Sequence, residues 1–247
     1  MRTVRALSWI ELKLFLREPV TVVFTLALPP LVLYVLAQVF GNTPNSTTFR
    51  GVGPVNYYVP AYIGLVTASL GLIGLPVHLA AYRERGVLRR LQAARMPVPA
   101  LLASQLFVLS AGVVAGSVIL VALARLSYHI AWPANWLGVA FSMILSTLMF
   151  AAIGFLLGVA LPTARAAQGI GMLLWFLMMM VSGAGPPPEV LNGSLRAVAA
   201  ATPLKHVIVA LQDPWLGRGV NWTETLILVG ILVGCAGLAA PALRRRT

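Results

Sequence analysis

Apolar residues form six long runs along the chain, and each run is long enough to cross a membrane as a helix. None of the runs contains Asp, Glu, Lys or Arg, and they cover residues 20–40, 57–81, 100–124, 134–160, 166–184 and 225–243. About 20 apolar residues in a helix span the hydrocarbon core of a bilayer. The pattern therefore predicts an all-α membrane protein with six transmembrane helices in a single domain, residues 1–247.

Composition and charge support a membrane location. Hydrophobic residues make up 59% of the chain and charged residues 10%, whereas soluble domains carry about 25% charged residues. With six spans, thirteen of the eighteen Lys and Arg residues lie on the side of the two termini. Basic loops stay in the cytoplasm. The Arg-rich, Ala- and Gly-rich composition is typical of a bacterium, so we expect a bacterial cytoplasmic membrane, both termini inside, and no nucleic-acid partner.

Residues 1–19 precede the first span and predict an interfacial helix. Arg2, Arg5, Lys13 and Arg17 fall on one arc of a helical wheel, with Trp9 among them. A basic face of this kind suits anionic lipid headgroups at the inner surface. Ordinary basic flanking of the first span is the alternative interpretation.

The segment 82-YRERGVLRRLQAARMP-97 lies between spans two and three and gathers charge in a charge-poor chain. A short helix is expected from about Arg83 to Ala94, because the residue before Pro97 disfavours helix. Leu88 and Leu91 are three residues apart and are flanked by arginines. An apolar contact with charged flanks suits docking of a soluble protein. A simple cytoplasmic anchor is the alternative.

Residues 185–223 separate spans five and six and are expected to form an outer helix pair. Three prolines interrupt the chain at 186–188, and helices are predicted over 189–201 and 204–212. The pair is expected to be re-entrant or to lie on the surface, and a plain extracellular loop is the alternative. Three GxxxG pairs within the spans predict close helix packing: Gly112–Gly116, Gly154–Gly158 and Gly230–Gly234.

The sequence carries no motif for energy conversion. It has no Walker phosphate-binding loop, no metal-ligand spacing and only scattered histidines, namely His78, His129 and His206. Ion-coupled transporters need ionisable side chains within the spans, and the six runs hold none except His78. Neither a metal site nor a catalytic residue is expected, and the energy for any transport is expected to come from outside the spans.

Four features together resemble the ABC type-two permease family, also called type V exporters. They are Arg17-Glu18-Pro19 with Pro29, then 84-ERGVLRRL-91 followed by Pro97, then Ser182-Gly183 with later prolines, Leu195 and Thr202-Pro203-Leu204, and the six-span topology. The chain departs from the family pattern at Val87 and Lys205, where Thr is usual, and at Arg89, where Glu is usual. The closest likeness is to daunorubicin-resistance permeases.

The resemblance implies a half-transporter that is not itself an enzyme. A separate ABC ATPase, in two copies, would bind ATP and Mg and dock on the coupling segment 82–97. A second permease, identical or homologous, would complete the pathway. The residues expected to couple to the ATPase are Arg83, Glu84, Arg85, Gly86, Leu88, Arg89 and Leu91.

The resemblance also implies that spans two and five line the transport path. Their side chains in this chain are apolar, aromatic or hydroxylic: Tyr62, Thr67, Ser69, Trp175, Phe176, Met178, Met179 and Met180. Flexible Met suits promiscuous apolar surfaces, so lipophilic or amphipathic cargo is expected. The same side chains could instead pack between helices.

Three other functions remain open at this level. They are a lipid or glycolipid flippase of the same architecture, a non-transporting membrane enzyme, and an assembly or sensor subunit. An enzyme predicts clustered polar residues at one membrane face, which the sequence does not show. An assembly or sensor subunit predicts no substrate-dependent turnover when the protein is purified with its ATPase. A neighbouring ATPase reading frame in the genome separates the transporter from the enzyme and the sensor.

Overall fold

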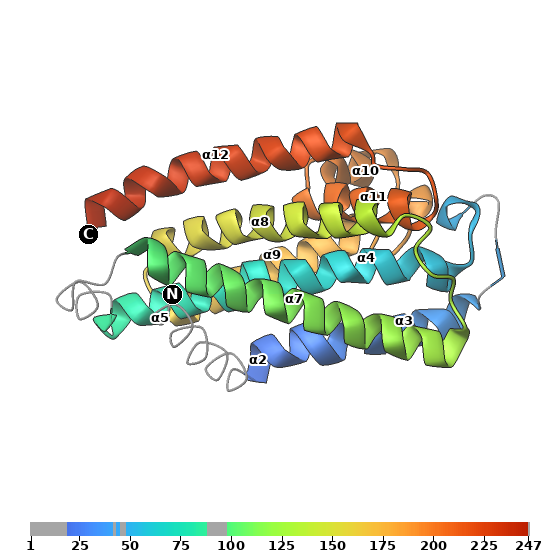
Figure 1. Cartoon of the computed structure of the whole chain (residues 1–247), viewed down its shortest axis with the longest axis horizontal. Coiled ribbons are helices and arrows are strands. Elements are labelled where there is room, and N and C mark those ends of the chain that lie inside the picture. Colours follow the sequence, from blue (N-terminus) through green and yellow to red (C-terminus); the bar gives the residue numbers. More distant parts are fainter. Residues whose placement is uncertain (1–18, 42, 45–47, 88–97, 247) are drawn as a thin grey trace.

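The computed structural model describes residues 19–41, 43–44, 48–87 and 98–246, and every regular element among them is helical. The long helices lie side by side along one direction (Figure 1). One end of the bundle contains the last turn of the second span and the C-terminal end of the chain. We call it the Arg83 end. The opposite end contains residues 48–53 and the short helices between spans five and six, and we call it the Arg50 end.

In the part of the chain that the structure describes, six helical stretches are long and apolar enough to cross a membrane, which confirms the predicted number of spans. They are Val23–Phe40, Pro54–Glu84, Leu101–Tyr128, Trp136–Ala160, Ala164–Val181 and Trp222–Ala239. The helices that contain them extend beyond these limits in places: α7 covers Val98–Tyr128, α8 Trp136–Ala160, α9 Ala164–Val181 and α12 Trp222–Arg246.

The first span begins with a short helix and a π-helical turn. Helix α2 covers Pro19–Val22, the turn η1 covers Val23–Ala27, and α3 covers Leu28–Phe40. Pro29 and Pro30 follow the turn and have no backbone N–H to donate to the preceding turn, which favours the wider geometry there. The predicted interfacial helix, residues 1–19, lies outside the described residues except for Pro19, which starts α2.

The second span is the centre of the fold and is almost entirely buried by the rest of the chain. It consists of α4 (Pro54–Ser69), a π-helical turn η3 (Leu70–Gly74) and α5 (Leu75–Glu84). Within η3, Leu75 N donates to Leu70 O, a residue further back than in an α-helix. Pro76 cannot donate to Leu72 O, so the break in the regular hydrogen-bond ladder follows from the sequence.

Glycines bring the backbones of three helices into contact at η3. A Cβ placed on Gly154 of α8 would lie 2.9 Å from Leu75 Cδ2, and one on Gly71 would lie 2.6 Å from Phe150 Cβ. On the other side, a Cβ on Gly171 of α9 would lie 3.0 Å from the carbonyl carbon of Leu72. The π-helical turn is therefore held between α8 and α9 at distances that only glycine permits.

Two GxxxG pairs, 154/158 and 230/234, differ from each other in what they contact. Gly154 and Gly158 pack against the second span, as predicted, since a Cβ on Gly158 would lie 2.8 Å from Leu79 Cβ. Gly230 and Gly234 face open space, so this pair packs no helix within the described part of the chain.

A bent helix pair follows span five, as predicted. After a short 3-10 turn (η4, Pro188–Val190) come α10 (Gly193–Ala200) and α11 (Pro203–Trp215), which are bent by 83°. Helix α11 packs between α4, α8 and α12, and Leu204, Val207 and Leu211 are fully buried. Figure 1 shows this pair at the Arg50 end. The second helix is thus part of the core and not a surface loop.

Candidate functional site

The Arg83 side chain lies against the carboxyl end of α8. Its Nη1 donates to Gly158 O at 3.0 Å and Val159 O at 2.6 Å, and its Nη2 donates to Leu161 O at 2.5 Å and Pro162 O at 3.1 Å. The last carbonyls of a helix have no partner within the helix, and Pro162 cannot supply an N–H to Gly158 O. A cation also interacts favourably with the negative end of the helix dipole. Arg83 therefore caps α8.

The helix that contains Arg83 differs from the expected one. A new helix was predicted from about Arg83, but Arg83 and Glu84 form the last turn of α5, and the chain turns at Arg85 and Gly86. Gly86 has a φ of 65°, which favours glycine. The turn that follows span two is therefore a helix C-terminus ended by a glycine. The other predicted coupling residues, Leu88, Arg89 and Leu91, lie outside the described residues.

A polar cleft of about 470 Å³ opens beside this turn. It lies between the end of α5 and the start of α9 and is lined by Val77, Glu84, Thr163, Ala164, Arg165 and Gln168. Glu84 and Arg165 are exposed, so the cleft presents a carboxylate and a guanidinium group. Thr163 caps α9, since its Oγ1 accepts from Ala166 N at 3.0 Å. The α8–α9 turn, residues 161–163, is therefore short and fixed at both ends.

The predicted path residues of the second span are buried within this single chain. Tyr62, Thr67 and Ser69 have no exposed surface. Thr67 Oγ1 donates to Ile63 O, and Ser69 Oγ donates to Leu65 O and to Phe24 O. Both hydroxyls thus serve helix backbone, and their side chains face neighbouring helices.

The predicted path residues of α9 divide between two faces. Trp175 and Met179 are buried, and the Trp175 indole Nε1 donates to Leu65 O at 3.3 Å. Phe176 is 52% exposed, and Met178 and Met180 are partly buried against the core. Only the buried face of α9 meets the second span.

Aromatic rings form a row along α4 from the Arg50 end into the bundle. Phe49 contacts Tyr57 and Tyr58 edge to face, and Tyr58 stacks on Tyr62 at 5.5 Å. Tyr58 Oη donates to Gly185 O at 2.8 Å, just after span five. The row joins the second span to the proline-rich segment that follows α9.

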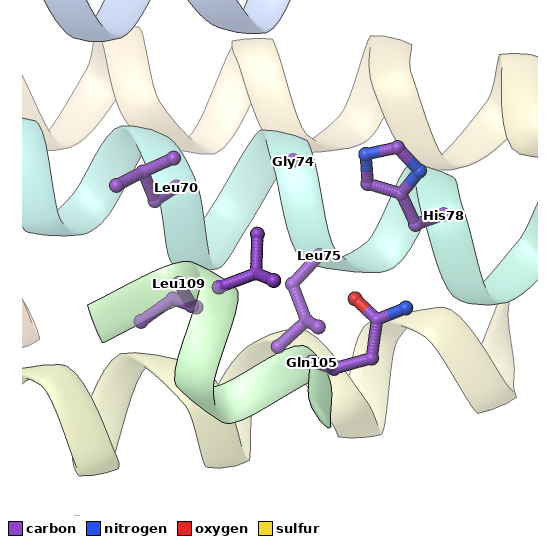
Figure 2. Close-up of a pocket in the computed structure, with 7 residues that line it drawn as sticks. Leu70, Gly74, Leu75, His78, Gln105 and Leu109 are labelled. Atoms are coloured by element: carbon purple, nitrogen blue, oxygen red, sulfur yellow. The ribbon is translucent and has the colours of Figure 1, made fainter. Parts of the chain in front are cut away.

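A small cavity lies where α7 crosses the π-helical turn, as Figure 2 shows. Its volume is about 20 Å³, and its lining residues are Leu70, Gly74, Leu75, His78, Gln105, Val108 and Leu109. A water molecule needs about 10–15 Å³, whereas drug-sized ligands occupy about 300–1,000 Å³. The cavity has room for water and is too small for lipophilic cargo.

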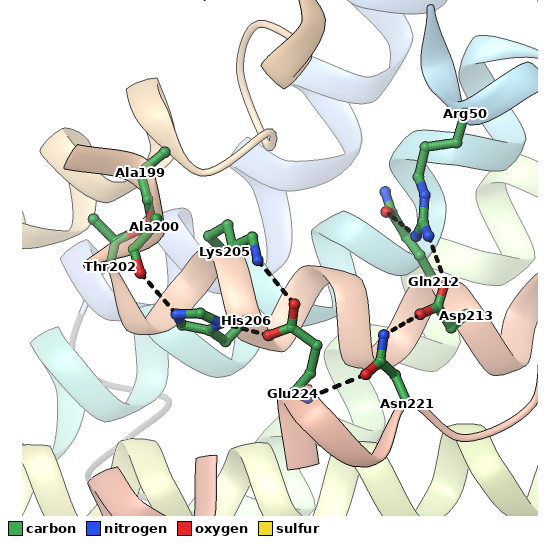
Figure 3. A network of polar contacts seen from close by, with 10 residues as sticks. All are labelled: Arg50, Ala199, Ala200, Thr202, Lys205, His206, Gln212, Asp213, Asn221 and Glu224. Atoms are coloured by element: carbon green, nitrogen blue, oxygen red, sulfur yellow. Dashed lines mark hydrogen bonds and ion pairs between the residues drawn. The ribbon is translucent and has the colours of Figure 1, made fainter. Parts of the chain in front are cut away.

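The Arg50 end is held by a polar network that links four segments, and Figure 3 shows its members Arg50, Gln212, Asp213 and Asn221. Arg50 Nη2 contacts Asp213 Oδ1 at 2.5 Å, and Arg50 Nη1 donates to Gln212 Oε1 at 3.1 Å. Asn221 Nδ2 donates to Asp213 Oδ2 at 2.7 Å, and Gln212 Nε2 donates to Tyr57 O at 3.1 Å. Residues 48–53, α4, α11 and the start of α12 are therefore joined by buried charge and amide groups.

Glu224 is a buried acid that the sequence pattern placed outside the spans. It lies in the first turn of α12, is 7% exposed, and accepts from Lys205 Nζ at 2.8 Å. Its other oxygen contacts His206 Nδ1, and His206 Nε2 contacts Ala200 O. Span six was predicted to begin at residue 225, which put this carboxylate in the loop. Asn221 was the signal in the sequence for an earlier helix start. Its side chain accepts a hydrogen bond from Glu224 N and caps α12, so Glu224 belongs to the first turn of the helix.

The described residues contain no group of three or more His, Cys, Asp and Glu side chains that could hold a metal ion. The buried Asp213, His206 and Glu224 instead bind neighbouring side chains or backbone.

These features define a multi-pass helical membrane protein whose polar cleft lies at the Arg83 end. The chain matches the ABC-2 type transporter family over residues 2–214. It belongs to this family and is a transmembrane permease subunit. ATP hydrolysis takes place in a partner nucleotide-binding subunit. No individually curated protein matches the chain significantly.

Proposed function

We propose that the chain is the membrane half of an ATP-driven exporter for hydrophobic or amphipathic compounds, of the daunorubicin-resistance kind. The observation that carries the proposal is the contact between the second span and α9. Trp175, Met179 and Tyr62 are buried there among apolar groups. The buried charged side chains of the described residues lie at the Arg50 end and not along this contact. A path that opens along this contact would suit cargo that leaves water readily.

The proposed location of the ATPase is the Arg83 end. Glu84 and Arg85 are exposed at the end of α5, directly before the remainder of segment 82–97, and the cleft beside them presents Arg165. We infer from the basic loops that this end faces the cytoplasm of a bacterium, where ATP is available. The ATPase docks there in two copies, one for each permease, and binds the ATP and Mg.

Leu88→Asp and Glu84→Ala in the full chain should separate ATP hydrolysis from transport. The first replaces an apolar docking residue with a charge, and the second removes the exposed acid beside Arg85. We expect less ATPase to co-purify with Leu88→Asp, and we expect both variants to transport less daunorubicin for each ATP hydrolysed in proteoliposomes. Unchanged transport in both would remove segment 82–97 from the docking site. Arg125→Gln at the Arg50 end is the charge-loss control.

The second permease is proposed to cover the exposed face of α9. Ile170, Leu173, Phe176 and Leu177 are 38%, 57%, 52% and 53% exposed and fall on one side of the helix. In a pair of permeases the two α9 helices would then lie next to each other, with Phe176 of each chain near the other.

Phe176→Cys should form a disulfide between two copies of the chain in oxidised native membranes. Cys235, the only natural cysteine, is first replaced by Ser. Val233→Cys on α12 is the matched control, because it is 64% exposed but lies on a helix that faces lipid in this arrangement. Dimers from position 233 and none from 176 would place α12, and not α9, between the permeases.

A lipid or glycolipid flippase shares this architecture and is the second candidate. Stimulation of ATP hydrolysis, measured in proteoliposomes of fixed lipid composition, distinguishes the flippase from the drug exporter. Daunorubicin should stimulate an exporter of the proposed kind. Movement of a fluorescent phospholipid between leaflets, without stimulation by daunorubicin, would favour the flippase.

A further inference from the structure

Arg83 joins two parts of the fold that lie far apart in the sequence. The four carbonyls that it contacts are 75 to 79 residues further along the chain. Two belong to the end of α8 and two to the α8–α9 turn, so one guanidinium group holds both. Hydrogen bonds from a charged donor are stronger than neutral ones.

We propose that Arg83 is a positioning residue that transmits movement of the coupling segment to α9, and not a residue that touches the ATPase. This inference rests on the proposed docking of the ATPase at segment 82–97. Its side chain is directed at the α8 terminus, whereas its neighbours Glu84 and Arg85 are exposed. Arg83 therefore lies within segment 82–97 but binds the end of α8 and the turn that follows it.

The α8–α9 turn is stiff enough to carry a displacement into α9. Leu161 N donates to Leu157 O at 2.9 Å, Pro162 restricts the backbone, and Thr163 caps α9. A shift of the turn therefore moves the first turn of α9 as well.

Helix α9 in turn reaches the proposed path. Gly171 lies against the Leu72 carbonyl, and Trp175 donates to Leu65 O in α4. A shift along α9 therefore alters its contact with the π-helical turn of the second span. Apolar packing between α5 and α9, such as Val77 and Ala80 against Ala167, permits sliding. The Arg83 hydrogen bonds, in contrast, hold the end of α5 to the end of α8 and to the α8–α9 turn.

Hydrogen exchange of the purified permease–ATPase complex tests the inference, with and without ATP plus vanadate. In the wild type we expect nucleotide-dependent changes in peptides from both 82–97 and 156–166. In Arg83→Gln the change in 82–97 should remain, while that in 156–166 should be lost. Transport of daunorubicin per ATP should fall about 2- to 30-fold, the range of coupling changes along such networks.

Two further variants separate transmission from simple stabilisation. Arg83→Lys keeps the charge and three donors but lacks the planar fork, so partial recovery of the 156–166 response is expected. Arg125→Gln removes a guanidinium at the end of α7 whose contacts, Ile130 O and the Trp132 ring, lie in the loop that follows at the Arg50 end, and it should behave as the wild type.

Three results would overturn the inference. An unchanged 156–166 response in Arg83→Gln would show that packing alone transmits the movement. A lower yield of complex with normal transport per ATP would reduce Arg83 to a stabilising cap. If the wild-type peptide 82–97 does not respond to nucleotide, the docking proposal itself fails, and the inference fails with it.

Discussion

Gly171→Ala should lower the stability of the permease by about 3 kcal/mol, at the upper end of the cost of overpacking. The added methyl carbon would lie 3.0 Å from the Leu72 carbonyl carbon and closer to its oxygen. Both are backbone atoms of the π-helical turn, so no side chain can rotate away. The helices α9 and η3 would have to separate, and the Trp175 hydrogen bond to Leu65 O would stretch with them.

The measurement is the thermal midpoint in detergent, followed by size-exclusion chromatography of heated samples. Gly230→Ala on α12 is the matched control, because a Cβ there meets no atom within 4 Å. In an exposed helix interior, Gly→Ala stabilises by up to about 1 kcal/mol, so the control should be neutral or slightly more stable. Equal midpoints for the two variants would show that the α9–η3 contact is looser than the structure describes.

Asp213→Ala should lower stability by about 2–4 kcal/mol, because removal of one partner leaves a charge without compensation in a buried pair. Asp213 is 5% exposed and binds both Arg50 and Asn221. The Arg50 side chain is 22% exposed, so water relieves part of the cost. The loss should loosen residues 48–53 and the start of α12 together.

A double-mutant cycle with Arg50→Ala measures this pair directly. The double variant should be less destabilised than the sum of the two single variants, because the second removal eliminates the unpaired charge. Glu189→Ala is the control for loss of an acid at the same end, since Glu189 is exposed. Additive effects of Arg50→Ala and Asp213→Ala would mean that the two side chains do not interact in the membrane-embedded protein.

Local features of the fold followed from the sequence. Six apolar runs predicted the six spans, because the bilayer requires uninterrupted apolar helices. Proline positions predicted the interruption after span five. The π-helical turn before Pro76 has a local cause as well, although its position was not predicted from the pattern.

The candidate site was less predictable, and three residues show why. The charge pattern placed Arg83 in a docking helix, but its donors face α8 carbonyls from a segment 75 residues away. The apolar run placed Glu224 in a loop, but it is buried beside Lys205 and His206. The GxxxG spacing was the same for Gly154 and for Gly230, yet only the first packs a helix.

By itself, the sequence determined the membrane-spanning architecture, the absence of a Walker loop, and the segment where charge is concentrated. These properties depend on transfer of side chains between water and lipid and on short-range backbone geometry, which neighbouring residues decide. Only the tertiary structure decided which face of each helix meets which neighbour. That choice depends on helix rotation and on contacts between distant segments. It places the Arg83 guanidinium at the end of α8, buries Glu224 and brings Gly171 into backbone contact with the second span.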